Sequence, residues 1–490
     1  MDLWNSMSTN DSRTENNAVT HSTSNNNIVD FFFSLGAMRN TSPEDIKLSF
    51  AKAFYSDRDL AMRAMFYARD IRGGQGERNV FNACIKWLAN EHPSYLTANF
   101  ENIAEYGRWS DFITLFDTAL SNEAVTYWAE AIRSEDPLAC KWAPREKSSN
   151  RKVAVALAKT LNMPPKAYRK HLARCTKVVE TQMCDKSWDD IVYSHVPSRA
   201  MKIYAGAFER NSNNFKPWLE SLVKGEVKVN SKTLYPHELV HEAGKWDITE
   251  DHKALLQAMW EQLPDYFDGN TRNVLPIIDV SGSMSSIIST SSTMTCMDVA
   301  VGLGMYCALR TEGIFKNKFI TFETSPRLME IPAHASFSEK VNFVKQAPWG
   351  GNTNFQATFE LILNSAVKDN LRQIDLPDII LCVSDMEFDS AGSSYAYYNS
   401  NEEDTNFQAI KQKFEDKGYT MPRLVFWNVQ DRSMSNVPVK SNEDGVALIS
   451  GFSPSVMKTV LTSDNFTPYT IVLDTLLSSR YDSVRVPAFG

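Results

Sequence analysis

Several features that would assign this chain of 490 residues to a specialised class are missing. Its seven cysteines are scattered and form no CxxC pair, so the sequence supports neither a disulfide framework nor a cysteine zinc site, and a reducing compartment is expected. The N-terminus is polar and acidic and does not resemble a signal peptide. No apolar run approaches the roughly 20 residues needed to span a bilayer. These absences predict a soluble cytoplasmic protein without a membrane segment.

A large excess of charge is also missing. The formal net charge of −8 argues against a chain that coats nucleic acid over its whole surface, although it leaves local basic patches open. An apolar content of 43% over this length is sufficient for more than one packed core. The composition therefore predicts a multidomain globular protein.

The pattern of apolar residues divides the chain into three parts. Residues 1–27 are rich in Asn, Ser and Thr, and we expect a disordered tail. Residues 28–268 carry apolar side chains at helical spacing in many short segments, such as 43–55 and 59–69, which predicts an all-α, HEAT-like repeat domain. In residues 269–490, strand-length apolar runs alternate with helical segments, which predicts a doubly wound, mostly parallel α/β sheet.

A candidate metal site lies at the start of the α/β part. A short apolar run leads into a Gly-containing turn that carries Asp279, Ser281 and Ser283, whose oxygens suit a divalent cation. This Asp-x-Ser-x-Ser order resembles the metal-ion-dependent adhesion site (MIDAS) of von Willebrand factor A (vWA) domains. The family pattern adds a Thr and an Asp from two later loops, and Thr353 and Asp385 match it in order. The resemblance implies a vWA domain in which these five residues hold a divalent cation, with Mg²⁺ expected.

Two Gly-containing turns mark the helical part. Residues 67–78 read Tyr-Ala-Arg-Asp-Ile-Arg-Gly-Gly-Gln-Gly-Glu-Arg, and residues 105–112 read Glu-Tyr-Gly-Arg-Trp-Ser-Asp-Phe. With residues 141–146 and the vWA-like part, they resemble the TROVE-plus-vWA architecture of the Ro ribonucleoprotein family. The resemblance is closer still to a divergent TROVE-like family of fungi, plants, bacteria and phages. It implies a non-enzymatic protein whose helical-repeat ring binds small structured or single-stranded RNA.

One basic segment stands out in this acidic chain. Residues 141–177 contain eleven Lys or Arg residues and one acidic residue, Glu146. Such a cluster is typical of a surface that binds an anionic ligand, although a solvated helix face also explains it. The candidate RNA contacts are the basic residues of the two turns and of this segment: Arg69, Arg72, Arg78, Arg108, Lys141, Arg145, Arg151, Lys152, Lys166, Arg169, Lys170 and Arg174.

Two alternative functions remain. A protein-interaction scaffold without RNA would use the metal site to bind an acidic group of a protein partner. A zinc metalloprotease would use the HExxH match formed by His237, Glu238 and His241, with Asp247 as third ligand. Against the protease, Pro236 predicts that the helix starts at the motif, whereas a zincin helix places its first His well inside. A Ser-His-Asp triad finds no support.

Overall fold

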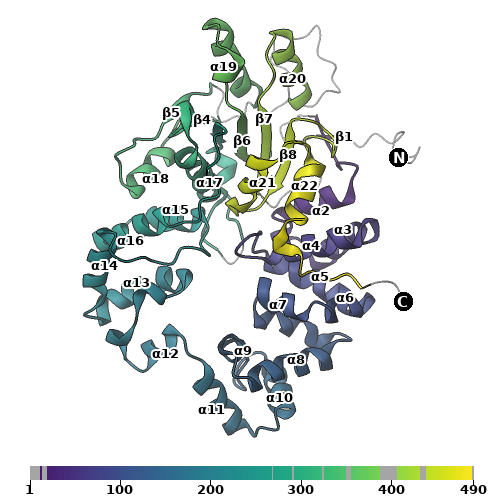
Figure 1. Ribbon diagram of the computed structural model, residues 1–490, viewed down its shortest axis with the longest axis vertical. Coiled ribbons are helices and arrows are strands. Elements are labelled where there is room, and N and C mark those ends of the chain that lie inside the picture. Colours follow the sequence, from purple (N-terminus) through teal and green to yellow (C-terminus); the bar gives the residue numbers. More distant parts are fainter. Residues whose placement is uncertain are drawn as a thin grey trace. The chain divides into compact units, whose positions relative to one another are not determined.

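The computed structural model describes residues 11–13, 19–267, 269–289, 292–322, 325–348, 355–386, 406–430 and 437–487. A helical region over about residues 20–260 precedes a mixed α/β region, as predicted (Figure 1). The helices of the first region are α2 (Asn27–Ser34), α3 (Pro43–Ser56), α4 (Arg58–Arg69), α5 (Arg78–Glu91), α6 (Pro93–Thr97), α7 (Phe100–Tyr106), α8 (Ser121–Arg133), α9 (Pro137–Trp142), α10 (Arg151–Thr160), α11 (Pro165–Cys175), α12 (Val179–Cys184), α13 (Ser198–Asn211), α14 (Phe215–Val223), α15 (Pro236–Ala243) and α16 (Glu250–Glu261). Among the described residues, none of the helices combines the length and apolar character needed to cross a bilayer.

Local signals explain where these helices begin. The Ser42 side chain accepts a hydrogen bond from the backbone N–H of Asp45, and Pro43 occupies the first turn of α3. Asp57 caps α4 in the same way through the N–H of Leu60. Each cap satisfies a donor that the first helical turn leaves unpaired. The helices predicted at 43–55 and 59–69 are confirmed to within a residue.

The second region forms a six-stranded sheet flanked by helices (Figure 1). Its elements are β3 (Val274–Ile278), α17 (Cys296–Arg310), β4 (Lys318–Thr321), β5 (Leu328–Glu330), α18 (Phe337–Lys345), α19 (Phe355–Lys368), β6 (Ile379–Ser384), α20 (Asn406–Asp416), β7 (Arg423–Asn428), β8 (Val446–Ser450), α21 (Met457–Thr462) and α22 (Pro468–Leu476). The strand order is β5-β4-β3-β6-β7-β8, and only β5 runs antiparallel to its neighbour.

This strand order creates a switch point between β3 and β6. From β3 the sheet grows in one direction through β4 and β5, and in the other through β6, β7 and β8. In doubly wound sheets, ligands bind in the crevice at the carboxyl ends of the strands where the order reverses. Because Ile278 pairs with Val383, Asp279 and Ser384 leave the sheet side by side at this point. The topology therefore brings together the described residues that directly follow β3 and β6.

Helix α17 lies between the sheet and α15, and two of its glycines allow both neighbours to approach it closely. A Cβ atom at Gly302 would lie 2.7 Å from the backbone nitrogen of His237 in α15. At Gly304 it would lie 2.4 Å from the Ile278 side chain of β3. Both distances are shorter than van der Waals contact, so these positions require glycine.

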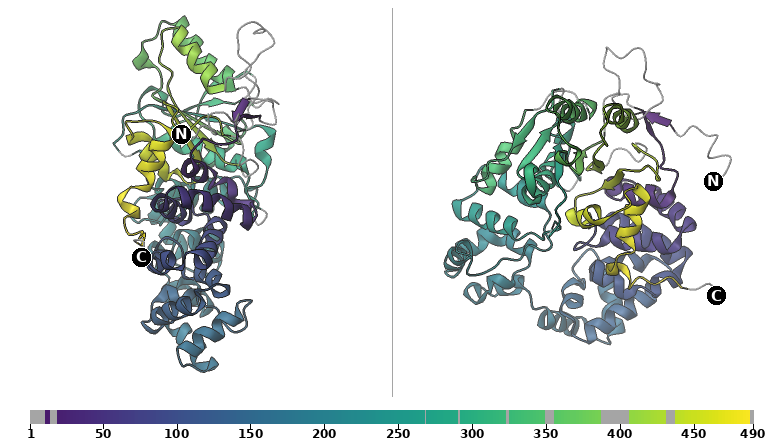
Figure 2. Two further views of the ribbon diagram at one scale, coloured as in Figure 1. Left: turned by 90° about the vertical axis from the view of Figure 1, so that its right-hand side faces the viewer. Right: turned by 45° about the horizontal axis from the view of Figure 1, so that its top comes forward.

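The compact units do not follow the expected boundary at residue 268. One unit contains residues 1–41 and 234–475, and the other contains residues 42–233 and 476–490. Residues 1–41 and the start of the second segment at residue 234 belong to the first unit because α2 packs against β8 and α15 packs against α17. The C-terminal segment returns to the helical unit, where it lies along the early helices (Figure 2).

Two short strands lie within residues 1–27, for which the sequence predicts a disordered tail. Asp11–Arg13 (β1) pairs antiparallel with Val19–His21 (β2), while residues 1–10 and 14–18 lie outside the described residues. His21 also exchanges two backbone hydrogen bonds with Val437, at 2.9 and 2.8 Å. In the described residues 11–13 and 19–21, backbone hydrogen bonds pair the chain without the apolar side chains that a core would need.

Candidate functional site

Asp279 is a fully buried ligand of the candidate metal site. It follows β3 directly, and its backbone N–H donates to the carbonyl of Val383 at 3.2 Å. One carboxylate oxygen accepts from the backbone N–H of Ser281 at 2.9 Å. This turn holds the Asp279 side chain at the carboxyl edge of the sheet, where the sequence placed it.

Two serine hydroxyls line the turn that follows. The Oγ atoms of Ser281 and Ser283 lie 3.1 Å apart. Ser281 is buried and Ser283 is exposed, so the pair runs from the interior to the surface. The turn continues as a short 3-10 helix over Gly282–Ser285. Three of the five predicted ligands are therefore neighbours in one turn.

Asp385 joins this group from β6. It is buried, and the Ser384 hydroxyl next to it donates to Asp279 Oδ2 at 2.7 Å and lies 3.4 Å from Asp385 Oδ1. Met386 then adopts a left-handed backbone with φ of 65°, and its N–H donates to Ser384 Oγ at 3.2 Å. One hydroxyl thus contacts both carboxylates. Ser384 was not predicted, although its place beside Asp279 follows from the register of the two strands.

The two carboxylates make the site electrostatically costly without a cation. Burial raises the pKa of Asp279 to about 7, and the nearby Asp385 adds to the rise. Two buried carboxylates and two hydroxyls form the hard oxygen donor set that Mg²⁺ prefers, so the residues fit this ion. The fifth predicted ligand, Thr353, lies outside the described residues.

The HExxH residues occupy a packed helix. Helix α15 begins at Pro236, as predicted, and His237 is buried with its ring 4.9 Å from that of Phe452. His241 Nδ1 lies 2.9 Å from Asp298 Oδ2, and its Nε2 lies 3.1 Å from Thr293 Oγ1. The carboxylate beside His241 is therefore that of Asp298, and the expected third ligand, Asp247, is exposed. His237 therefore packs in the interior, and His241 contacts Asp298 and Thr293.

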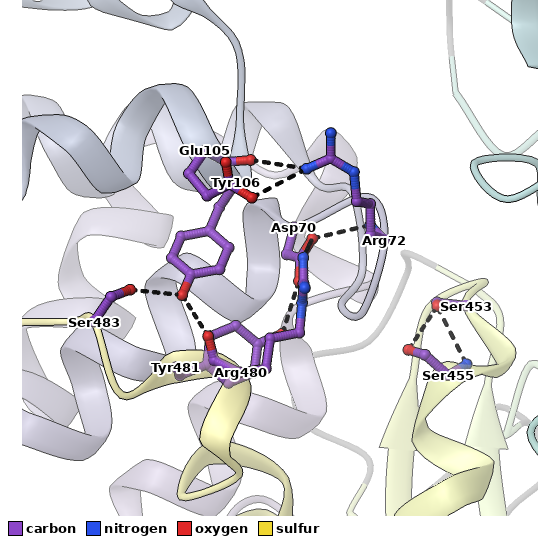
Figure 3. A network of polar contacts seen from close by, with 9 residues as sticks. All are labelled: Asp70, Arg72, Glu105, Tyr106, Ser453, Ser455, Arg480, Tyr481 and Ser483. Atoms are coloured by element: carbon purple, nitrogen blue, oxygen red, sulfur yellow. Dashed lines mark hydrogen bonds and ion pairs between the residues drawn. The ribbon is translucent and has the colours of Figure 1, made fainter. Parts of the chain in front are cut away.

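The first Gly-containing turn binds the C-terminal segment of its own unit. Arg480 forms a two-pronged ion pair with the buried Asp70, with Nη2 2.7 Å from Oδ1, and Tyr481 donates to Asp70 Oδ2 at 3.2 Å (Figure 3). A Cβ atom at Gly73 would lie 2.5 Å from the Arg480 side chain, so the turn needs glycine to admit this guanidinium. Arg72 pairs instead with Glu105 at 3.3 Å, with both side chains more than half exposed.

Two arginines of the first turn segment, Arg69 and Arg78, pair with one buried carboxylate. Asp111 is fully buried and accepts from Arg69 Nε at 2.7 Å and from Arg78 Nε at 2.9 Å. Arg69, which the sequence predicts as an RNA contact, is itself only 5% exposed. Arg78 is 42% exposed, and Arg108 lies over the Trp142 ring at 4.8 Å. Burial lowers the pKa of Arg108, and Arg78 and Arg69 lower it further.

The basic segment covers α10 and α11 and the end of α9, and the eight of its cations that are predicted RNA contacts fall into two groups. Lys141, Arg169 and Arg174 pair with acidic side chains, and Arg145 donates to the carbonyl of Ala143. The second group is exposed, and the described part of the chain offers it no ion pair: Arg151, Lys152, Lys166 and Lys170.

A cavity of about 720 Å³ adjoins this segment within the helical unit. Lys141, Arg174, Lys177 and His195 contribute basic groups to its wall. Its other walls include apolar side chains of Leu138, Ile191, Val192 and Val196. Glu180 and Asp190 also line this cavity, so its wall carries charges of both signs beside the apolar side chains.

Comparison with known protein families identifies the family to which the chain belongs. A family described as "Domain of unknown function (DUF2828)" matches residues 14–163 and 145–266, which together span more than half of the chain. The chain belongs to this family. A second family, "Domain of unknown function (DUF7788)", matches residues 273–475, the part with the sheet and the candidate metal site. Among individual proteins, "Uncharacterized protein L728" of Acanthamoeba polyphaga mimivirus is 28% identical over 94% of this chain and 86% of its own length.

Proposed function

We propose that this chain is a non-enzymatic RNA-binding protein, resembling the Ro ribonucleoprotein family, with a TROVE-like helical part and a vWA-like domain that holds Mg²⁺. The RNA-binding part of this proposal rests on the four exposed cations of the basic segment that have no ion pair among the described residues: Arg151, Lys152, Lys166 and Lys170. Lys166 and Lys170 lie one turn apart on α11, so both side chains share one face. Arg151 and Lys152 add exposed charge from α10, which packs against α11. Exposed cations without acidic partners are free to neutralise phosphates.

Two neighbouring features support the same ligand class. Arg78 and Arg108 lie near the carboxylate of Asp111, which already pairs with the buried Arg69. The positive charge around Asp111 therefore exceeds the negative charge. The lining of the cavity has more cations, Lys141, Arg174 and Lys177, than carboxylates, Glu180 and Asp190. Together with its apolar walls, this excess of positive charge suits a nucleotide base and its phosphate. These features therefore support single-stranded or structured RNA as the ligand.

Salt-dependent RNA binding tests this proposal. The double variant Lys166→Glu/Lys170→Glu is compared with Lys224→Glu/Lys228→Glu, which makes the same charge change at exposed positions elsewhere in the helical unit. The first variant should weaken binding of a single-stranded RNA and reduce the slope of log K against log salt by about 1.4, or about 0.7 per lost phosphate contact. The control should leave the slope unchanged. Equal effects in both variants, or no RNA affinity of the wild type at low salt, would refute RNA binding through this surface.

The metal site supports the vWA-like part and a second candidate function. Asp279 and Asp385 are buried, whereas Ser283 is exposed. A cation held by these residues could therefore also bind a carboxylate of another protein from the solvent side. A protein-interaction scaffold would use the site in this way. A protein partner that binds only with Mg²⁺ and is lost in Asp279→Ala, while Lys166→Glu/Lys170→Glu leaves it bound, would favour the scaffold.

A further inference from the structure

Three potential metal ligands meet where α9 packs against α11. Cys140 comes from α9, and His171 and Cys175 lie one turn apart on α11. Their ligand atoms all lie within 4.8 Å of one another, and Cys175 Sγ is 3.9 Å from His171 Nε2. Both cysteines are buried, whereas His171 is partly exposed. Cys140 and Cys175 are distant in the sequence, so only the helix packing brings them together.

We propose that Cys140, His171 and Cys175 bind a zinc ion, with water in the fourth position. Zinc holds sulfur at about 2.3 Å and imidazole nitrogen at about 2.0 Å in a tetrahedron, so neighbouring ligand atoms lie about 3.5–3.8 Å apart. The Cys175–His171 separation of 3.9 Å is about 0.4 Å longer than the sulfur–nitrogen spacing of such a site. The remaining contacts lie within 4.8 Å, so they need to shorten by no more than about 1.3 Å, a change that side-chain torsions allow.

The charge balance suits a buried location. Cys140 and Cys175 each lose a proton to solvent when their sulfurs bind the ion, and His171 donates a lone pair as neutral imidazole. Two thiolates then neutralise Zn²⁺, so the cluster of ion and ligands carries no net charge. A neutral cluster avoids the desolvation cost that an unpaired ion would incur in the interior.

The surroundings of His171 must adjust in two respects. Its Nε2 lies 3.0 Å from the carbonyl of Ile132, and its Nδ1 lies 3.3 Å from Arg174 Nη2. The carbonyl of Ile132 gives up the imidazole N–H but keeps the backbone N–H of Glu135 at 3.1 Å, and Arg174 moves. When Nε2 binds the ion, the ring proton occupies Nδ1, and Arg174 must turn away from it. Arg174 can keep its ion pair with Glu135 as it does so, because that carboxylate also contacts Nη2.

A bound ion would fix the geometry of the basic segment. Lys141 directly follows Cys140, and Arg174 directly precedes Cys175. Zinc would therefore tie α9 to α11 and hold these two cations at the wall of the same cavity. The site does not depend on the proposed RNA binding, because the ligand geometry alone carries it.

Cobalt provides a direct probe. Reduced full-length protein is titrated with Co²⁺, and we expect one equivalent to produce the thiolate-to-cobalt charge-transfer absorption, which Zn²⁺ then displaces. Cys140→Ser and Cys175→Ser should each weaken binding at least 100-fold, since loss of an outer partner alone costs about 10–100-fold. Cys184→Ser, an exposed cysteine on α12, is the matched control and should bind normally. Absence of the absorption in the wild type, or its full retention in both ligand variants, would overturn the proposal.

A second measurement avoids variants that fail to fold. Zn²⁺ should slow alkylation of Cys140 and Cys175 in the unmodified protein, while Cys184 continues to react at its metal-free rate; peptide mass spectrometry reports all three. Equal protection of Cys184, or no protection of the other two, would contradict the site.

Discussion

Ser384 donates a hydrogen bond to Asp279 across the point where β3 and β6 lie side by side, with 2.7 Å between Ser384 Oγ and Asp279 Oδ2. The same hydroxyl lies 3.4 Å from Asp385 Oδ1. Ser384 therefore orients both carboxylates of the candidate metal site, although it is fully buried and has no direct path to solvent.

Removal of this hydroxyl should weaken Mg²⁺ binding. We expect Ser384→Ala to raise the Mg²⁺ dissociation constant about 10-fold, because partners that orient metal ligands typically contribute 10–100-fold to affinity. Titration calorimetry measures the effect. Ser285→Ala is the control, since that exposed hydroxyl only donates to the carbonyl of Gly282. Equal affinity in wild type and Ser384→Ala would mean that the hydroxyl does not position the ligands.

Asp279→Asn should change stability in opposite directions with and without metal. In EDTA the variant should unfold at a higher temperature than the wild type, because it removes a charge buried beside Asp385. With Mg²⁺ at 100 times its dissociation constant, the wild type should gain about 2.7 kcal/mol and the variant should gain nothing. Thermal unfolding followed by circular dichroism measures both. A Mg²⁺-dependent gain that persists in Asp279→Asn would place the ion elsewhere.

Arg69 and Arg72 should differ sharply despite their proximity in the sequence. Arg69→Met removes one partner of a buried ion pair and leaves Asp111 with Arg78, so we expect a loss of about 3–5 kcal/mol in unfolding free energy. Arg72→Met breaks an exposed pair with Glu105 and should cost at most about 1 kcal/mol. Urea unfolding measures both variants. A small loss for Arg69→Met would show that the Arg69–Asp111 pair does not stabilise the helical unit.

Asp298 should make stability depend on pH in the acidic range. Burial alone would raise the pKa of this carboxyl, but Lys345 at 2.6 Å, with His241 and the backbone of Thr295, lowers it below the ordinary value of 3.8. A lowered pKa contributes stability that is present above about pH 4 and is lost as the pH falls towards the folded-state pKa. The difference in unfolding free energy between wild type and Asp298→Asn should therefore shrink below pH 4. Urea unfolding from pH 3 to pH 7 measures it, and a constant difference across this range would contradict the role of the ion pair.

Much of the local structure follows from the sequence. Helices at 43–55 and 59–69, the strand before Asp279 and the helix start at Pro236 were predicted because each has a local cause: a cap, an apolar period or a proline. The placement of Asp279 and Asp385 at strand ends followed in the same way, since each comes directly after an apolar run.

Side-chain partners depended on the tertiary structure. Arg69 and Arg78 look alike in sequence, yet packing buries one and leaves the other 42% exposed. The role of His241 depended on Asp298, which lies 57 residues away. The Cys140–His171–Cys175 group has no sequence spacing that would mark it, because it exists only where two helices pack together.

The sequence by itself determined the order of helices and strands and the candidate metal ligands after β3 and β6, because caps, periodicity and strand ends are local properties of the chain. Only the tertiary structure decided that Ser384 joins the two carboxylates, that the C-terminal segment returns to the helical unit, and which cations stay exposed. Burial and pairing are set by residues far apart in the chain, and no local pattern encodes them.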